Sequence, residues 1–327
     1  MDHWCALRNL LKQRSQMGKK EKPDIHFVPP PNRGQLELPI AREVTDDRNA
    51  NLGGRSFYFF DLDDNVLFLS TPTFLFHKET GKEVEISSAE YAKIQKQIGQ
   101  TGPYRDYRVD FCNRTGSFRR FRDQDHSLIK KMLGKRQGFI EDLARALGYP
   151  DFHWKGPSWS CFYHAVLNQR PLSLITARGH HPSTLSEGMR LLVKEKYLPQ
   201  EPNYLSLFPV SHPEIRRSLG DVQLEKSVPE LKRAAIRESV EKAIEIYGMN
   251  PHHRFGMSDD DPHNIDLIVT EMKALKRKHE EMSFFVIETQ GGNLVKWEVY
   301  SDHVEATLCA KVQEISIFEQ LPLFKQE

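Results

Sequence analysis

The sequence predicts an α/β fold in which a doubly wound parallel sheet carries an inserted cap and a polar N-terminal arm. Short apolar runs end abruptly in polar residues, as at Phe57–Phe60, Leu172–Ile175 and Phe284–Ile287, and such runs suit strands that are buried on both faces. Helical stretches lie between these runs. Strands that alternate with helices favour a parallel sheet with right-handed crossovers.

The chain divides into three parts by composition. Residues 1–54 are polar and interrupted by proline and glycine, which predicts a largely irregular arm. Residues 55–75 and 156–327 carry the alternating pattern and are assigned to the core. Residues 76–155 open with a predicted hairpin around Gly81 and are assigned to a flap and an inserted cap.

The elements follow one another with recognisable start and stop signals. We expect, in order, strands at 57–60, 73–77 and 83–86, helices at 88–98, 127–147 and 159–168, a strand at 172–175, a helix at 183–196, a strand at 204–210, a helix at 229–247, a strand at 254–257, a helix at 263–280, and strands at 284–287 and 295–299. The last of these strands is expected at an edge of the sheet.

The composition narrows the possible functions. A chain of 327 residues with 39% hydrophobic residues has enough apolar surface for a folded core. The 46 Lys and Arg residues balance 45 Asp and Glu residues, so nucleic acid is possible but not indicated by charge, and no membrane surface is expected as a partner. The four cysteines are scattered, and a cytoplasmic location is expected because no export signal is visible. The oligomeric state has no signature in the sequence.

Polar residues follow three predicted strands that lie far apart in the sequence. Asp61 and Asp63 follow the first strand, Thr176 follows the strand after the insert, and Asp259 and Asp260 follow a later one. Because the carboxyl ends of parallel strands form the ligand crevice of an open sheet, we expect these side chains to meet in one site.

The carboxylates of this site have distinct chemical tasks. Asp61, held at the end of a buried strand, can attack phosphorus and form an aspartyl-phosphate. Asp63 can protonate the leaving oxygen and later deprotonate water. Repulsion between these anions and a phosphate requires a hard cation with oxygen ligands, for which Mg²⁺ is the natural candidate. The predicted metal ligands are Asp61, Asp63, Asp259 and Asp260.

The loop after the second of these strands offers hydrogen-bond donors. Thr176 can donate its hydroxyl to a phosphoryl oxygen, and the backbone from Ala177 onward adds N–H groups. Arg178 either binds the phosphoryl group or pairs with a nearby carboxylate. Asp261 is expected to cap the following helix, and Asn264 to support the metal ligands.

This ordered set of motifs resembles the haloacid dehalogenase-like (HAD) hydrolase superfamily over roughly residues 55–289. The resemblance rests on an apolar strand followed by two aspartates in an Asp-x-Asp pattern, on Thr176 after a strand, and on the acidic pair at 259–260. Asn65 stands where threonine is usual in the first motif. The paired aspartates are those that distinguish phosphatases of this superfamily from its dehalogenases.

The resemblance implies a Mg²⁺-dependent phosphatase that works through Asp61 and carries a cap that sets the substrate choice. The stretch of roughly 110 residues between the first two motifs is longer than a hairpin and one helix require, as expected of such a cap. The resemblance also implies one lysine ahead of the acidic pair that contacts the phosphoryl group. Lys232 is expected in this role, with Lys226 as the alternative.

Two other functions stay open. The protein could be a non-catalytic phospholigand-binding or scaffold protein on the same fold, which Asn65 and the polar arm favour, or a phosphotransferase. The basic aromatic segment Phe118–Arg122 either contacts nucleotides or forms a solvated face of the cap. The pair His180–His181 does not predict zinc, because adjacent side chains rarely face one ion. The expected partner is a small-molecule or macromolecular phosphomonoester, which no motif specifies further.

Overall fold

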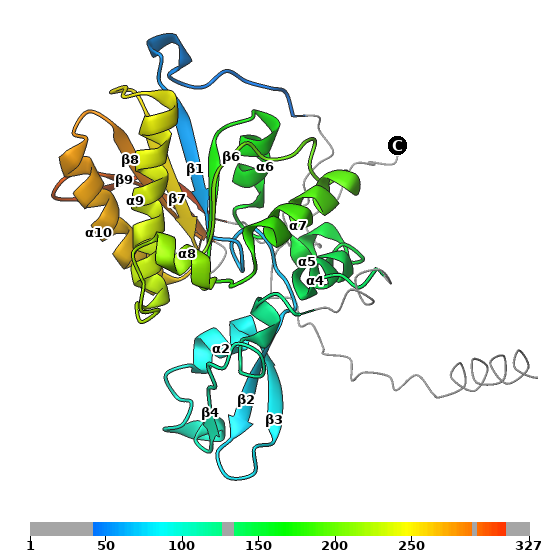
Figure 1. Cartoon of the computed structure of the whole chain (residues 1–327). Helices are drawn as coiled ribbons and strands as arrows, with labels where there is room; N and C mark the ends of the chain where they lie inside the picture. The colour runs from blue at the N-terminus through cyan, green and yellow to red at the C-terminus, as the bar shows by residue number, and fades with distance from the viewer. Residues whose placement is uncertain (1–41, 126–133, 290–292, 312–327) are drawn as a thin grey trace, which may run out of the picture. The chain divides into compact units, whose positions relative to one another are not determined.

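The computed structural model covers most of the predicted core and insert (Figure 1). The residues that it describes are 42–125, 134–289 and 293–311. All of these residues belong to one compact unit of the chain, residues 32–327. Residues 1–41 of the predicted N-terminal arm therefore lie outside the described residues.

Seven strands form the main sheet, in the order β10-β9-β8-β7-β1-β5-β6. Strands β6, β5, β1, β7 and β8 run parallel, whereas β9 and β10 pair in antiparallel fashion on one side. The prediction of an α/β fold with a mostly parallel sheet is confirmed. The strands are β1 (Ser56–Phe60), β5 (Leu172–Thr176), β6 (Tyr204–Pro209), β7 (Arg254–Asp259), β8 (Ser283–Glu288), β9 (Asn293–Val299) and β10 (Val304–Lys311).

Helices cover both faces of this sheet (Figure 1). Phe57 and Phe59 point from β1 into a core with α9 (Val228–Tyr247) and α10 (Pro262–Lys278). Phe60 points into the core on the other face, as expected from the alternation of side chains along a strand. The helices besides α9 and α10 that belong to this domain are α4 (Gly138–Ala146), α5 (Asp151–Trp154), α6 (Trp159–Leu167), α7 (Pro182–Lys194) and α8 (Pro213–Ser218). Across the described ranges, no helix combines the length and the apolar character needed to cross a membrane.

Local signals fix where the helices α9 and α10 begin. The Ser227 hydroxyl accepts a hydrogen bond from the Glu230 N–H while the Glu230 carboxylate accepts one from the Ser227 N–H, which is a capping box at the start of α9. The Asp261 carboxylate accepts from the His263 N–H at the start of α10, where Pro262 fits the first turn. Asp261 therefore has the capping role that the sequence predicts.

A separate three-stranded sheet, in the order β3-β2-β4, lies in the insert between β1 and β5. The predicted hairpin is present, and Gly81 adopts a φ of 66° in its turn, a conformation that glycine tolerates best. We call residues 72–122 the hairpin lobe. Its elements are β2 (Pro72–His77), β3 (Glu83–Ser87), α2 (Ser88–Ile94), η2 (Gly102–Tyr104), β4 (Tyr107–Arg108) and η3 (Arg119–Phe121), and η1 (Ala50–Leu52) precedes β1.

Helices α4 and α5 lie within the predicted insert but pack with the main sheet. Phe139 and Leu143 of α4 and Trp154 of α5 are buried in the same core as Phe60. Gly188 of α7 makes room for the Phe139 ring, because a Cβ at that position would lie 2.3 Å from it. Only the hairpin lobe has a sheet of its own, whereas α4 and α5 contribute to the core of the main sheet.

Several predicted boundaries change in the structure. The strand predicted at an edge, β9, pairs with β8 on one side and β10 on the other, so its edge position was wrong. The helix predicted from residue 127 begins at Gly138 in the described part of the chain, and residues 126–133 lie outside it. Helix α2 ends at Ile94, earlier than predicted.

Candidate functional site

The candidate site lies at the carboxyl ends of β1 and β7, which are neighbours in the middle of the sheet. From β1 the chain continues to β5 and β6 on one side and returns later to β7 and β8 on the other. Such a reversal leaves a crevice between the two strands, where open α/β sheets bind their ligands. Asp61 follows β1 and Asp259 ends β7, so both carboxylates stand at this crevice.

Asp61, Asp259 and Asp260 form a compact group of carboxylates here, which we call the carboxylate group. One oxygen from each residue lies within 4.8 Å of the others. Asp61 and Asp259 are buried, and Asp260 is half-buried. Burial, together with the neighbouring carboxylates, raises the pKa of Asp61 well above its ordinary value and raises the pKa of Asp260 to about 8. The charged forms of these groups are therefore disfavoured unless a cation joins them.

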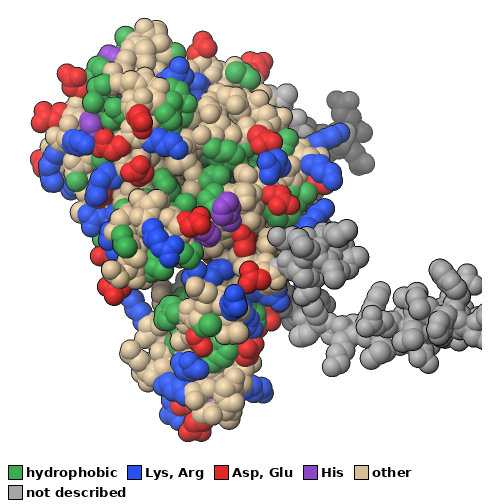
Figure 2. All heavy atoms as spheres, in the orientation of Figure 1, with side chains coloured by type: hydrophobic (Ala, Val, Ile, Leu, Met, Phe, Trp, Pro, Cys, Tyr) green, Lys and Arg blue, Asp and Glu red, His purple; other side chains and the backbone are tan. Residues whose placement is uncertain are grey.

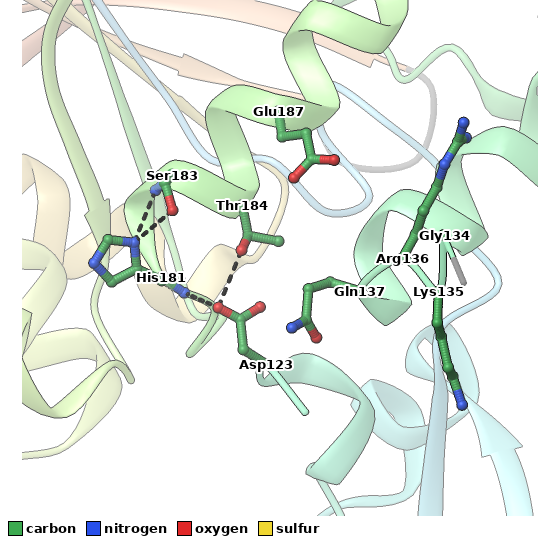
Figure 3. A pocket seen from close by; sticks show the side chains of 9 residues that line it. All are labelled: Asp123, Gly134, Lys135, Arg136, Gln137, His181, Ser183, Thr184 and Glu187. Carbon is green, nitrogen blue, oxygen red and sulfur yellow. Dashed lines mark hydrogen bonds between the residues drawn. The ribbon is translucent and has the colours of Figure 1, made fainter. Parts of the chain in front are cut away.

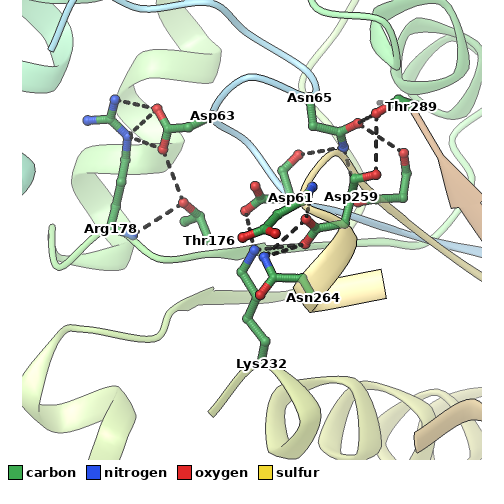
Figure 4. A network of polar contacts seen from close by, with 11 residues as sticks. Asp61, Asp63, Asn65, Thr176, Arg178, Lys232, Asp259, Asn264 and Thr289 are labelled. Atoms are coloured by element: carbon green, nitrogen blue, oxygen red, sulfur yellow. Dashed lines mark hydrogen bonds and ion pairs between the residues drawn. The ribbon is translucent and has the colours of Figure 1, made fainter. Parts of the chain in front are cut away.

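Lys232 brings a positive charge to this group. Its Nζ lies 2.8 Å from Asp259 Oδ2 and 3.2 Å from Asp61 Oδ1 (Figure 4). Burial alone would lower the pKa of Lys232, but the charges of Asp259 and Asp61 raise it above its ordinary value, so the side chain stays protonated. The alternative lysine, Lys226, is exposed and donates to Gly220 O at 2.9 Å. The structure therefore brings Lys232, and not Lys226, to the predicted site.

Asp259 is held in one orientation by its neighbours. Its Oδ1 accepts hydrogen bonds from Asn264 Nδ2 and from the backbone N–H of Asp261, both at 3.1 Å. Asn264 thus has the supporting position that the sequence predicts. Groups that orient a ligand in this way tune its affinity for a metal.

Asn65 ties the ends of β1 and β7 together (Figure 4). Its buried Nδ2 donates to the backbone oxygens of Asp61 at 3.1 Å and Ser258 at 3.0 Å. Its Oδ1 accepts from the hydroxyls of Ser158, Ser258 and Thr289 at 2.8, 3.1 and 3.0 Å. A threonine hydroxyl has a single donor and could not serve both backbone oxygens. Asparagine in this position therefore fixes the backbone of the first aspartate against the neighbouring strand.

Asp63 lies on the β5 side of the crevice, where it is paired with Arg178. Arg178 Nε lies 2.8 Å from Asp63 Oδ2 and Arg178 Nη2 lies 2.6 Å from Oδ1, an arrangement of two parallel charge-assisted hydrogen bonds. Thr176 Oγ1 donates to Oδ2 at 3.4 Å and accepts from the Arg178 N–H at 3.3 Å. The Asp63 carboxylate faces Arg178 and is not part of the carboxylate group. Ala177 is exposed between Thr176 and Arg178.

Arg178 is itself fully buried. Its guanidinium carbon lies 5.0 Å and 4.9 Å from the ring centroids of Phe121 and Phe139. Its Nη2 also donates to Thr71 Oγ1 at 2.9 Å, and Thr71 donates in turn to Asp142 Oδ2 at 2.9 Å. Because Thr71 directly precedes β2, these contacts link the β5 side of the crevice to the hairpin lobe and to α4.

The carboxylate group fits a divalent cation with oxygen ligands. When ionised, the carboxylate group carries three negative charges, and Lys232 supplies only one positive charge. Asp61 Oδ1 is buried and accepts no hydrogen bond of good geometry, although Lys232 Nζ lies 3.2 Å away. Mg²⁺ prefers such carboxylate oxygens, and its charge would offset the excess. The charge of Asp63 is already matched by Arg178.

The sequence did not point to the residues that support the site. Ser158, Ser258 and Thr289 bond to Asn65, and Thr71 and Asp142 extend the contacts of Arg178. The one available signal is a hydroxyl residue at the end of an otherwise apolar strand, such as Ser258 in β7. Hydroxyl residues in such positions are too common to be assigned a partner from sequence alone.

Comparisons with known proteins were made against families, curated proteins and solved structures. No family model matches the chain, and no curated protein or solved structure is significantly similar to it. The site is therefore interpreted from its own residues.

Proposed function

We propose that the protein is a Mg²⁺-dependent phosphomonoester hydrolase that works through an aspartyl-phosphate at Asp61. One observation carries this proposal, namely the carboxylate group with Lys232 at the crevice between β1 and β7. Buried anions with a single cation among them suit a metal ion together with a phosphate. The order of the motifs along the chain, which resembles that of the HAD-like superfamily, supports the same function, with the hairpin lobe as cap.

Asp61 is suited to be the nucleophile because its carboxylate is held at the end of a buried strand. Its attack forms an oxygen–phosphorus bond and breaks the bond from phosphorus to the leaving oxygen. Water then attacks the same phosphorus and releases phosphate and the free carboxylate. Lys232 would neutralise phosphoryl oxygens beside Asp61. Mg²⁺ held by Asp61, Asp259 and Asp260 would add further positive charge at the phosphoryl group.

Asp63 is the proposed general acid and base. Both of its oxygens accept hydrogen bonds from Arg178, so Asp63 would have to transfer its proton beside this ion pair, through a lone pair that Arg178 does not occupy. The Thr176 hydroxyl makes only a long contact with Asp63 and can turn to a phosphoryl oxygen. Substrate binding is therefore expected to rearrange the β5 side of the crevice.

The test is the hydrolysis of 4-nitrophenyl phosphate with and without Mg²⁺. We expect a Mg²⁺-dependent rate that EDTA abolishes and that Asp61→Asn lowers by at least about 10³-fold. Lys232→Gln should lose most of the rate, whereas Lys226→Gln is the matched control and should keep it, because Lys226 lies outside the carboxylate group. An Asp61→Asn variant that folds and keeps its rate would reject this nucleophile.

The pairing of Asp63 with Arg178 favours a second function, a non-catalytic phospholigand-binding or scaffold protein. In that case Mg²⁺ with phosphate raises the melting temperature through ligand linkage, while no phosphomonoester in a broad panel is turned over. A phosphotransferase differs from both in its products. It would give a phosphorylated acceptor in place of free phosphate.

A further inference from the structure

Arg122 lies where the hairpin lobe meets the loops that follow β5 and β6. It comes directly after η3 and forms a parallel bridge with Gly179, where the Gly179 N–H donates to Phe121 O at 2.9 Å. Arg122 Nη1 donates to Ser211 O, in the loop after β6, at 3.0 Å. The Arg122 side chain thus reaches from the lobe to the carboxyl edge of the main sheet.

The Arg122 side chain passes close to Gly179, where a Cβ would be tightly packed. A Cβ on Gly179 would lie 3.1 Å from both Cγ and Nη1 of Arg122 and 3.2 Å from Ser211 O. Contacts this short would force the guanidinium group to move. Gly179 therefore allows Arg122 to be held against the sheet edge in a defined position.

The Arg122 guanidinium is half-buried, and its charge has no carboxylate partner among the described residues. Burial, and then the charge of Arg216, lowers the pKa of Arg122. The adjacent Asp123 carboxylate is turned toward α7, where it accepts from His181 N at 2.9 Å and Thr184 Oγ1 at 3.0 Å (Figure 3). Asp123 lines a hollow of about 550 Å³ beside α7 and does not pair with Arg122.

Buried nitrogen atoms without hydrogen-bond partners also occur on histidines whose pKa the Arg122 charge lowers. Both ring nitrogens of His180, Nδ1 of His212 and Nη1 of Arg178 are buried and have no partner in the described part of the chain. After burial, the charges of Arg178, Arg122 and His212 each lower the pKa of His180, so these groups lie around one ring. We call these four residues the nitrogen cluster. His180 and Arg178 are fully buried, so the half-buried Arg122 is the arginine of this cluster that an anion can reach.

The nitrogen cluster lies on the side of the site where the leaving group would sit. Its member Arg178 binds Asp63, the proposed acid for the leaving oxygen. Strand β6 is two positions from β1 in the sheet, which is about 10 Å at the usual spacing of strands. Ser211 follows β6, so Arg122 contacts a loop at the edge of the sheet where Asp61 follows β1. Near the junction of the hairpin lobe and the main domain, Figure 2 shows histidine, lysine and arginine side chains together with acidic ones.

We propose that the leaving group of the substrate carries a second anionic group, a carboxylate or a phosphate, which pairs with Arg122. This inference rests on the proposed hydrolase function and names its substrate class. A guanidinium fork matches two oxygens of either anion. The carboxylates of Glu214 and Asp123 lie near His212 and would repel an anion there. The subsite is therefore limited to the region around the Arg122 guanidinium group.

The experiment compares phenyl phosphate with 4-carboxyphenyl phosphate, which differ only in the second anion. We expect a KM for the carboxylated ester that is lower by about tenfold in the native protein. Arg122→Gln should raise that KM about tenfold and leave the KM of phenyl phosphate unchanged. The matched control is Arg105→Gln, which removes an exposed arginine of the hairpin lobe that pairs with Asp106 at 3.3 Å. It should change neither KM.

The rate with phenyl phosphate reports whether each variant is folded. Arg122→Lys keeps the charge without the fork and should give an intermediate KM for the carboxylated ester, which decides the matter if Arg122→Gln does not fold. A third substrate, 1,4-phenylene bisphosphate, shows which anion is preferred. Equal effects of Arg122→Gln on the two monoesters, or none, would overturn the second-anion inference and leave the hydrolase function standing. No turnover of any ester by the native protein would overturn both.

Discussion

The two sides of the crevice hold their aspartates in opposite electrostatic states. Between β1 and β7, Asp61, Asp259 and Asp260 share the single charge of Lys232, and the pKa of Asp61 and that of Asp260 are raised. Beside β5, by contrast, Asp63 is paired with the buried Arg178, which donates a hydrogen bond to each of its carboxylate oxygens. When ionised, the first side carries more negative than positive charge, whereas the carboxylate on the second side is matched by an arginine.

This difference shows that the two aspartates of one short motif are held by separate sets of contacts. Asp61 depends on contacts within the main sheet, through Asn65 and Lys232. Asp63 depends on Arg178, which is covered by residues of the insert. Substitutions on either side should therefore have separable effects on metal binding, activity and stability.

The largest effect is expected from removing a negative charge between β1 and β7, where the proposed cation would bind. Asp259→Asn should lower the hydrolysis rate by at least about 10³-fold, or about 4 kcal/mol of activation free energy, because the metal loses a ligand and Lys232 loses its closest partner. It should also abolish the rise in melting temperature on adding Mg²⁺. Asp261→Asn is the control, since asparagine caps a helix as well as aspartate does. A normal response of Asp259→Asn to Mg²⁺ would contradict the proposed coordination.

A smaller but still large effect is expected from breaking the ion pair on the β5 side. Arg178→Met should destabilise the folded protein by about 3 kcal/mol, because it leaves the Asp63 carboxylate without its buried partner. Adding Asp63→Asn should recover part of this loss, since the unpaired charge is then gone. Urea denaturation of both variants measures the two effects. If the double variant were no more stable than the single one, packing around Arg178 and not charge pairing would explain its burial.

The contacts that hold the two strands together should matter less than either charge. Asn65→Ala should lower the free energy of unfolding by about 2 kcal/mol, because it leaves buried hydroxyl and carbonyl groups without partners. The free energy of unfolding of Asn65→Thr should lie between that of Asn65→Ala and that of the native protein. Asn203→Ala, which removes one exposed hydrogen bond to Gln169 O, is the control and should stay within about 0.5 kcal/mol of the native protein. An equal loss of stability in Asn65→Ala and Asn203→Ala would show that Asn65 has no special role.

The smallest effect is a dependence of stability on pH in EDTA. Asp260 has a pKa of about 8 in the folded protein against an ordinary value of 3.8, so the folded state keeps a proton that the unfolded state has lost. Its contribution to stability is complete below about pH 4 and is lost as the pH rises to about 8, which amounts to about 1 kcal/mol between pH 7 and pH 8.

Excess Mg²⁺ should reverse this trend, because the metal binds the deprotonated carboxylate. Urea denaturation at pH 7 and pH 8, with EDTA or with Mg²⁺, measures how the free energy of unfolding changes with pH in each condition. Asp260→Asn should flatten the slope in EDTA. The same slope in that variant and in the native protein would assign the effect to another group.

The strands of the main sheet could be predicted because their sequences are apolar on both faces. This holds for β5, whose five residues are all buried, and for the apolar part of β1, where Phe57, Phe59 and Phe60 are buried. The same reasoning could not find β10, which pairs with only one described strand and alternates polar with apolar residues. It also could not place α4 in the core, since the fit of Phe139 against Gly188 is a tertiary contact.

The meeting of Asp61 with Asp259 could be predicted because residues that follow neighbouring parallel strands share one edge of the sheet. Lys232 was expected only through the resemblance to a known family. The pairing of Arg178 with Asp63 was one of two alternatives, and sequence alone could not choose between them because the choice depends on how deeply the arginine is buried. The role of Asn65 was hidden, since its partners come from four separate segments.

Thr71 stands at the root of the hairpin lobe, with its hydroxyl between Arg178 and Asp142. This hydroxyl joins the start of the lobe to the arginine that binds Asp63, whereas the backbone at Asp61 is bonded to β7 through Asn65. Two aspartates that are two positions apart in the chain are thus anchored to different parts of the molecule.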